Sequence, residues 1–198
     1  MGKLFVLMGK SASGKDAVYR NIINNKELRL SRVVSYTTRP LRANESEGVQ
    51  YFFRTEEDFN RLLSEKKIIE YRTYNTKRGI WRYFTADDGQ IDLEKRSYII
   101  IGTIEAFKSL RAYYGEDKVL PVLIAADDGI RLERALRRER RQQQPQYAEM
   151  CRRFLADDED FSKEKIEAAR IGRVFKNEGS LEDCLDEVIK YCERAVEG

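Results

Sequence analysis

The chain has 198 residues, of which 41% are hydrophobic and 36% charged, and its formal net charge is only +3. This composition indicates a soluble globular protein of one domain, and the balanced charge gives no general case for binding nucleic acid or membranes. The sequence holds no histidine, which excludes catalysis by a histidine base or nucleophile. Its three cysteines lack metal-binding or disulfide spacing and no signal peptide is visible, so we expect free thiols and a cytoplasmic protein.

The first predicted strand is the apolar run 3–8, and a helical pattern follows over residues 17–23. Between them lies a stretch with the spacing G-x-x-x-x-G-K of the phosphate-binding loop. Glycines let such a loop turn its N–H groups toward phosphate oxygens, while the helix N-terminus and a lysine add positive charge. The predicted ATP-binding residues are Gly9, Lys10, Ser11, Ala12, Ser13, Gly14, Lys15 and Asp16, and Lys15 is also a predicted catalytic residue.

Asp16 takes the loop position where serine or threonine usually holds Mg²⁺. A carboxylate also binds Mg²⁺, although it repels phosphates. We therefore expect Mg²⁺ as the cofactor, bound together with ATP, and Asp16 as its protein ligand. The plainer interpretation of the whole stretch, a glycine turn with a surface lysine, is disfavoured by the strand before it and the helix after it.

The elements that follow alternate between strand and helix. Strands are predicted at residues 32–36, 50–53, 68–72, 97–101, 119–125 and 173–176. Helices are predicted at 55–63, after a capping box that starts at Thr55, and at 105–114, 128–141 and 180–192. In the helix at 128–141 we expect Leu132, Ala135 and Leu136 to face the core. The alternation predicts an α/β protein with the three-layer α/β/α fold of P-loop NTPases and a parallel core sheet.

Two stretches interrupt this alternation. Residues 33–92 hold several short strand patterns and one helix, and residues 131–156 are polar and strongly basic. We therefore expect a single domain with an inserted lobe at 33–92 and a separate basic segment at 131–156. The core would comprise residues 1–32, 93–130 and 157–198.

Residues 35–53 fit the pattern S-x-T-T-R-x-x-R-x-x-E-x-x-G-x-x-Y-x-F at every stated position. This stretch resembles the monophosphate-binding segment of guanylate kinases. The residue types suit a phosphate monoester, because guanidinium groups bind it through paired charge-assisted hydrogen bonds. The resemblance implies a GMP site in which Arg39, Arg42 and Tyr51 bind the phosphate, Ser35 contacts guanine and Glu45 supports the arginines.

Three later segments extend the resemblance. Glu70 looks like the family's guanine-binding glutamate, since a carboxylate can accept from the adjacent N1–H and 2-amino groups. Tyr83-Phe84-Thr85 stands where the family has a Tyr-Gly-Thr/Ser turn, so Tyr83 and Thr85 are implied as a phosphate and a guanine contact, although Phe84 departs from the pattern. Val174-Phe175-Lys176-Asn177 is similar to the family's last strand and implies that Asn177 lies beside adenine.

Eight arginines lie between residues 131 and 153. Such a run is in general a solvated helix face or a nucleic-acid patch. The resemblance implies instead a lid that inserts arginines at the transferring phosphoryl group, where positive charge accelerates transfer. Spacing points to Arg141 and to Arg152 or Arg153 as catalytic residues, with Arg138 as a further candidate. We expect the remaining arginines to pair with the acidic run 157–160.

Two other functions stay open. The predicted strand at 97–101 runs into Gly102-Thr103, where guanylate kinases have acidic residues. This feature and the Lys15-Asp16 pair look like ribose 1,5-bisphosphate phosphokinases, which lack the full arginine, tyrosine and glutamate set found here. A non-catalytic guanylate-kinase-like binding module is the second alternative, which Lys15 and the arginine run disfavour. We expect ATP-dependent phosphorylation of GMP to GDP, with these nucleotides as partners and neither nucleic acid nor membrane, by a monomer or homodimer.

Overall fold

The computed structural model describes residues 1–42, 44–76 and 79–197. The larger of its two sheets has five parallel strands in the order β2-β7-β1-β8-β9. The order places β1, the first strand of the chain, at the centre of the sheet, as its uninterrupted apolar sequence predicts for a strand covered on both faces. The bounds are β1 Leu4–Met8, β2 Ser31–Arg32, β7 Tyr98–Ile101, β8 Val119–Ala125 and β9 Val174–Lys176.

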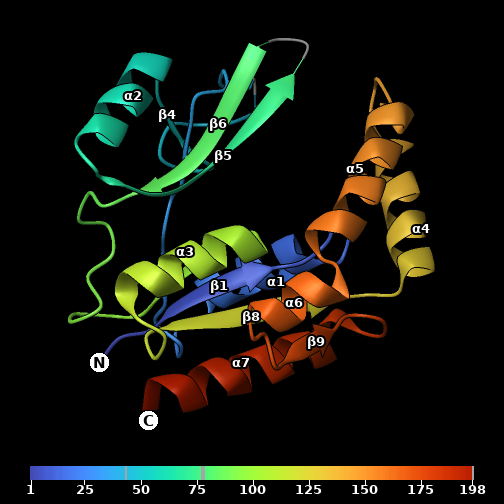
Figure 1. Ribbon diagram of the computed structural model, residues 1–198. Helices are drawn as coiled ribbons and strands as arrows, with labels where there is room; N and C mark the ends of the chain where they lie inside the picture. Colours follow the sequence, from blue (N-terminus) through green and yellow to red (C-terminus); the bar gives the residue numbers. More distant parts are fainter. Residues whose placement is uncertain (43, 77–78, 198) are drawn as a thin grey trace.

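Helices cover both faces of this sheet (Figure 1). The side chains of β1 alternate, so that Leu4, Val6 and Met8 pack with helix α3 (Ile104–Tyr114) in one buried cluster. Phe5 and Leu7 pack in a second cluster with α1 (Lys15–Asn24) and α7 (Leu181–Glu197). The predicted three-layer α/β/α arrangement with a parallel core sheet is therefore present.

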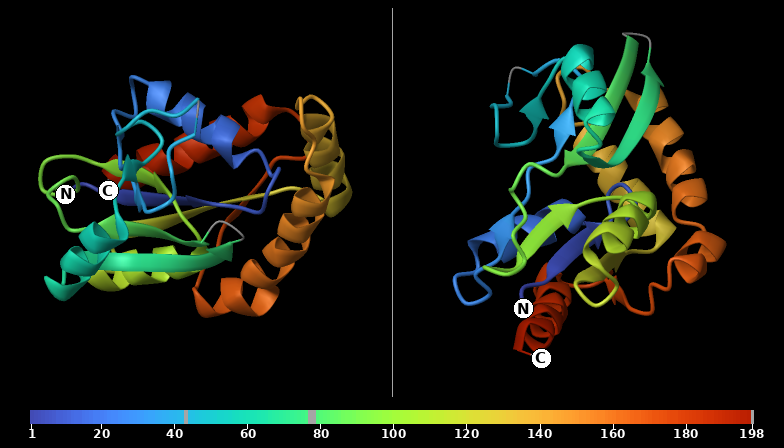
Figure 2. Two further views of the ribbon diagram at one scale, coloured as in Figure 1. Left: turned by 90° about the horizontal axis from the view of Figure 1, so that it is seen from above. Right: turned by 60° about the vertical axis from the view of Figure 1, so that its left-hand side comes forward.

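The smaller sheet has the order β4-β3-β6-β5, and helix α2 (Glu56–Ser64) covers one of its faces (Figures 1 and 2). Its strands are β3 Tyr36–Thr37, β4 Phe52–Phe53, β5 Ile68–Thr76 and β6 Gly79–Ala86. Phe59 of α2 packs against Tyr36 and Phe84 in a separate core. The predicted capping box is confirmed, because the Thr55 hydroxyl accepts the Asp58 N–H and the Asp58 carboxylate accepts the Thr55 N–H.

Helices α4 (Asp128–Glu139) and α5 (Tyr147–Asp160) form an antiparallel pair beside the large sheet, followed by the short helix α6 (Lys163–Ala168) (Figure 1). The turn between them is held by Glu139, a buried residue whose carboxylate accepts the Gln146 N–H. In the described part of the chain, none of these helices or the others is long and apolar enough to cross a membrane. The predicted free cysteines are confirmed, with Cys151 exposed and Cys184 and Cys192 buried.

Three details of the sequence prediction are wrong. The strand expected at 32–36 is two separate strands, because β2 joins the large sheet and β3 the small one. Tyr83-Phe84-Thr85, expected as a turn, lies within strand β6. Leu132 is 43% exposed rather than inward, because the buried side of α4 is centred on Arg131 and Ala135. Each error arises where tertiary packing, not local pattern, decides the outcome.

Candidate active site

The loop between β1 and α1 has the geometry of a phosphate-binding turn. Gly14 has φ 94°, and a Cβ added there would lie 2.0 Å from Nδ2 of Asn177, so both backbone conformation and space require glycine. Ala12 also adopts the left-handed region, with φ 61°, at a cost of about 1 kcal/mol for a residue with a side chain. Nδ2 of Asn177 donates to the Ser13 carbonyl at 2.8 Å, which ties the loop to the end of β9. The loop is thus held in a strained, open turn.

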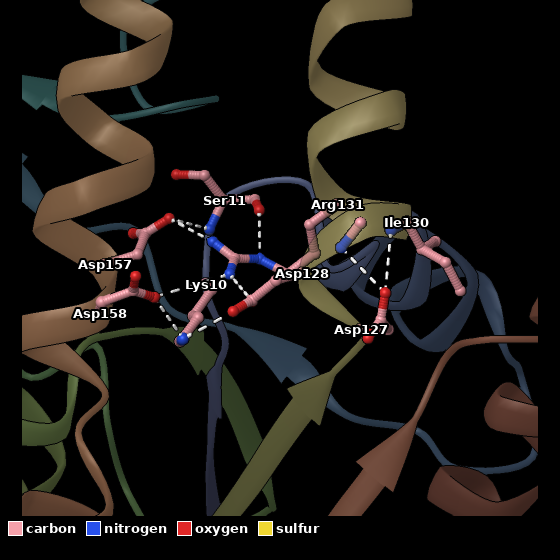
Figure 3. Close-up of polar contacts among 9 residues, drawn as sticks. Lys10, Ser11, Asp127, Asp128, Ile130, Arg131, Asp157 and Asp158 are labelled. Carbon is pink, nitrogen blue, oxygen red and sulfur yellow. Dashed lines mark hydrogen bonds and ion pairs between the residues drawn. The ribbon is translucent and has the colours of Figure 1, made fainter.

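Helices α4 and α5 hold the same loop from outside (Figure 3). The Arg131 side chain is fully buried, and its Nε donates to the Ser11 carbonyl at 3.1 Å while Nη2 donates to Asp157 at 3.0 Å. Asp157 also accepts the Ser11 N–H at 2.7 Å. Lys10 pairs with Asp158 at 2.6 Å. The Ser11 N–H and the Lys10 ammonium are therefore bound by carboxylates. The N–H groups of Lys15 and Asp16 lie in the first turn of α1, where they have no carbonyl acceptor within the helix.

A second group of side chains comes from the small sheet and the segment before it. Arg39 is 3% exposed and donates from both Nη atoms to Glu45, at 2.6 Å each. These hydrogen bonds raise the pKa of Arg39 and hold the pKa of Glu45 below its usual range. Glu45 also accepts the Arg42 N–H at 3.1 Å, and the Arg39 guanidinium lies 5.0 Å from the centre of the Tyr51 ring. Glu45 thus holds the Arg39 guanidinium and the Arg42 backbone in one place.

One face of the β5–β6 hairpin carries the predicted base-reading residues. Glu70 is 7% exposed, lies opposite Thr85 in the strand register and accepts the Thr85 hydroxyl at 2.8 Å. Tyr83 lies on the same face of β6, with its ring centre 5.4 Å from that of Tyr51. Burial raises the pKa of the Tyr51 phenol. The hairpin therefore brings Glu70, Tyr83, Thr85 and Tyr51 together, although from a strand rather than the expected turn.

The profile of the family described as guanylate kinase matches residues 1–161. The chain belongs to the guanylate kinase family. The guanylate kinase of Mycoplasma mobile is 43% identical over 70 residues, which is 35% of each chain. That of Streptococcus agalactiae is 42% identical over 73 residues, 37% of this chain and 35% of the relative. The aligned segments thus cover only about a third of the length of these relatives.

A solved guanylate kinase, from Anaplasma phagocytophilum, shares the fold along the whole chain. The superposition covers 100% of this chain and 87% of the other, with a TM-score of 0.67 and 20% identity. The predicted P-loop fold is confirmed by this likeness and by the parallel sheet.

Four buried side-chain N or O atoms without a hydrogen-bond partner are found among the described residues: Ser13 Oγ, Arg39 Nε, Arg72 Nε and Arg134 Nη1. Unpaired buried polar atoms are rare in native proteins and call for a physical explanation, such as a ligand. Ser13 and Arg39 belong to the predicted site of this guanylate kinase family member. Arg72 and Arg134 were missed, although strand alternation from Glu70 would have placed Arg72 on the same face.

The predicted arginines of the α4–α5 pair do not reach the loop in this structure. Arg141, Arg152, Arg153 and the further candidate Arg138 are exposed. Arg152 and Arg153 both donate to Glu149, which lowers the pKa of Glu149 to about 2. Arg134 also lies near the loop, with Nη1 4.0 Å from where a Cβ on Gly14 would be. The expected pairing of arginines with the acidic run is seen for Arg131.

Carboxylates near the loop are the protein groups that could hold Mg²⁺. No group of three or more His, Cys, Asp or Glu side chains that could hold a metal occurs within residues 1–42, 44–76 and 79–197. Mg²⁺, however, commonly takes one or two carboxylates together with substrate phosphates. The Asp16 carboxylate is 60% exposed, stands at the mouth of the loop and lies 3.0 Å from the Lys15 ammonium. A single carboxylate at that place fits a nucleotide-bound Mg²⁺.

Proposed function

We propose that this chain transfers the γ-phosphoryl group of ATP to GMP, forming ADP and GDP. The observation that carries the proposal is the buried Glu70 carboxylate, oriented by Thr85 on the same side of the small sheet as Arg39 and Tyr51. A carboxylate matches guanine because N1–H and the 2-amino group are adjacent donors. The arginine and the phenol supply donors for a phosphate at the other end of such a ligand.

On the donor side, Lys15 and the N–H groups at the start of α1 bind the β- and γ-phosphates of ATP. Asn177 lies at the end of β9 and is the proposed adenine neighbour. Mg²⁺ bound with ATP and held by Asp16 would neutralise charge on the phosphate oxygens. Residues 131–156 act as the lid, and Arg134, Arg141, Arg152 and Arg153 are the arginines available to approach the γ-phosphate when the lid closes.

Direct phosphoryl transfer requires little covalent chemistry from the protein. An oxygen of the GMP phosphate attacks the γ-phosphorus, and the bond from that phosphorus to the β–γ bridging oxygen breaks, which releases ADP. No general base is required because the attacking oxygen is already anionic. Closure of the lobe at 33–92 and of the lid excludes water, which would otherwise hydrolyse ATP. The protein contributes by positioning the two substrates, by supplying positive charge and by excluding water from the cleft.

A sugar bisphosphate is the second candidate acceptor. The first relevant feature is Asp16, which follows Lys15 in the loop. The second is Gly102 at the end of β7, where a Cβ would lie 2.9 Å from Val6 Cγ1, so that an acidic residue in place of Gly102 would require repacking. These two features favour a ribose 1,5-bisphosphate phosphokinase. We rank it below GMP, because the acceptor lobe and not the loop meets the acceptor.

The test is ADP release from ATP-Mg²⁺ with GMP, AMP, UMP, CMP and ribose 1,5-bisphosphate offered in parallel. Turnover with GMP alone is the expected result. Turnover with the sugar bisphosphate would replace the proposal by the second candidate, and GMP binding without any turnover would indicate a binding module. In the Lys15→Ala variant, turnover should vanish while GMP binding stays near normal, and an active variant would refute the role of the loop.

A further inference from the structure

Arg72, in the middle of β5, carries a charged group that the protein does not satisfy by itself. Its Nε is buried without a hydrogen-bond partner and lies 3.5 Å from Oε2 of Glu70. That separation gives an ion pair but not a hydrogen bond. A buried guanidinium N–H without an acceptor costs free energy, so its presence points to an acceptor that arrives from outside the protein.

The strand geometry places Arg72 on the face of the small sheet that carries Glu70. Side chains of β5 alternate, so Arg72 shares the face of Glu70 and lies opposite Tyr83 in the register. Arg72 also lines a separate cavity of about 250 Å³ between the hairpin and the core, to which Glu105, Asp160 and Lys165 contribute charged groups. The hairpin lies above α3 in Figure 1. A ligand on this face of the small sheet therefore meets Arg72.

A second unpaired donor lies on the same side. The Nε of Arg39 is also buried without a partner. The Arg39 guanidinium lies 5.0 Å from the centre of the Tyr51 ring, and that ring centre is 5.4 Å from the ring centre of Tyr83, the residue opposite Arg72 in the register. The positive charges of Arg39 and Arg72 both act to lower the pKa of the Tyr51 phenol, against the larger effect of burial, which raises it. The two arginines and the phenol therefore supply donors for an oxyanion on one face of the small sheet.

We propose that Arg72 is a ligand of the acceptor phosphate, beside Arg39 and Tyr51. The inference rests on the proposed function and adds a residue to its acceptor site. The Nε–H groups of Arg39 and Arg72 donate to phosphate oxygens, and the Glu70 carboxylate accepts the N–H groups of the base with the lone pairs that the Thr85 hydroxyl does not occupy. In the competing role Arg72 is only a partner that holds Glu70 in place, and its replacement then weakens GMP and guanosine binding equally.

The experiment compares the binding of GMP and of guanosine, measured by calorimetry without ATP. The variants are Arg72→Met, Arg72→Lys and the matched control Arg82→Met. Arg82 belongs to the same hairpin, but its guanidinium lies over the Phe59 ring on the opposite face and pairs with Glu56. Arg72→Met should weaken GMP binding about 10- to 100-fold and guanosine binding by less than about twofold, as expected for a lost phosphate contact.

Arg72→Lys should recover part of the GMP affinity, because it keeps the charge, and Arg82→Met should leave the ratio of the two affinities unchanged. Equal losses for GMP and guanosine, an unchanged GMP affinity, or wild-type protein that binds GMP no more tightly than guanosine would each overturn the proposal. Should Arg72→Met lose its cooperative melt, Arg72→Gln serves in the same comparison. Wild-type protein that binds GMP but does not phosphorylate it would refute the proposed function and leave the result on Arg72 standing.

Discussion

The carboxylate of Asp157 accepts the backbone N–H of Ser11 at 2.7 Å, which joins helix α5 to the phosphate-binding loop across 146 residues of sequence. Arg131 completes the contact, since it donates both to Asp157 and to the Ser11 carbonyl (Figure 3). Both backbone polar groups of one loop residue are therefore held by an ion pair between α4 and α5. A change of loop conformation must move this helix pair as well.

The first prediction concerns the fully buried Arg131. Arg131→Met leaves Asp157, whose side chain is 15% exposed, beside the loop without its cation. Because loss of one partner from a fully buried pair typically costs about 3–5 kcal/mol, the free energy of unfolding, measured in urea, should fall by about the lower end of that range. The affinity for ATP should fall with it because the loop loses its support. Arg137→Met is the control, since Arg137 is exposed and pairs with Glu133 on the same helix. Its effect should stay within about 0.5 kcal/mol, and similar midpoints for the two variants would contradict the prediction.

The second prediction is a pH dependence from Glu45. The hydrogen bonds from Arg39 hold the pKa of Glu45 below its usual range in the folded protein. A lowered pKa stabilises the fold above the unfolded carboxyl value of about 4.3, and this contribution disappears as the pH falls through the lower folded value. Wild-type protein should therefore lose stability between about pH 5 and 3 more steeply than Glu45→Gln. Parallel curves of unfolding free energy against pH would show that the pair contributes no proton linkage.

The sequence predicts a structural feature well when the residues that form it are contiguous, and poorly when they are distant in the chain. The β1 strand, the loop and α1 are contiguous, so spacing and apolar pattern suffice to predict them. Alternation from Glu70 suffices to place Arg72 on the same face of its strand, but that this face meets Tyr83 depends on the register of β5 with β6, and Tyr83–Thr85 were expected in a turn. The Asp157–Ser11 contact is invisible to any local pattern because it joins residues brought together only by tertiary packing.

A buried charge misled the prediction for α4. Apolar periodicity places Leu132 inward, whereas the core side of that helix is occupied by Arg131, whose guanidinium also lies 4.5 Å from the centre of the Phe154 ring. Patterns of apolar residues cannot detect an arginine that is buried because three carboxylates, those of Asp128, Asp157 and Asp158, and one backbone carbonyl surround it. Functional and ionic cores are where such patterns fail.

The third prediction tests base recognition by Glu70. In Glu70→Gln an NH2 group, which is a donor, replaces one acceptor oxygen and faces the donors of guanine. The KM for GMP should therefore rise about 10- to 100-fold while the KM for ATP changes little. The substitution should raise the KM for IMP, which lacks the 2-amino group, by a smaller factor than the KM for GMP. An equal rise in the KM for ATP and for GMP would refute recognition of the base by Glu70.

The last prediction uses the three cysteines as reporters of packing. Burial raises the pKa of Cys184 to about 11 and that of Cys192 to about 12, and both thiols are packed between α7 and the sheet. Cys151 is exposed on α5. Since only the thiolate reacts with an aromatic disulfide reagent, the folded protein at about pH 8 should titrate one thiol rapidly and all three after unfolding in guanidinium.

Cys151→Ser should abolish the rapid phase without changing the slow one. The slow phase then measures how often α7 opens from the sheet, because Cys184 and Cys192 can react only in an open state. A rapidly reacting thiol in the folded Cys151→Ser variant would mean that α7 does not cover this face of the sheet as its buried cluster requires.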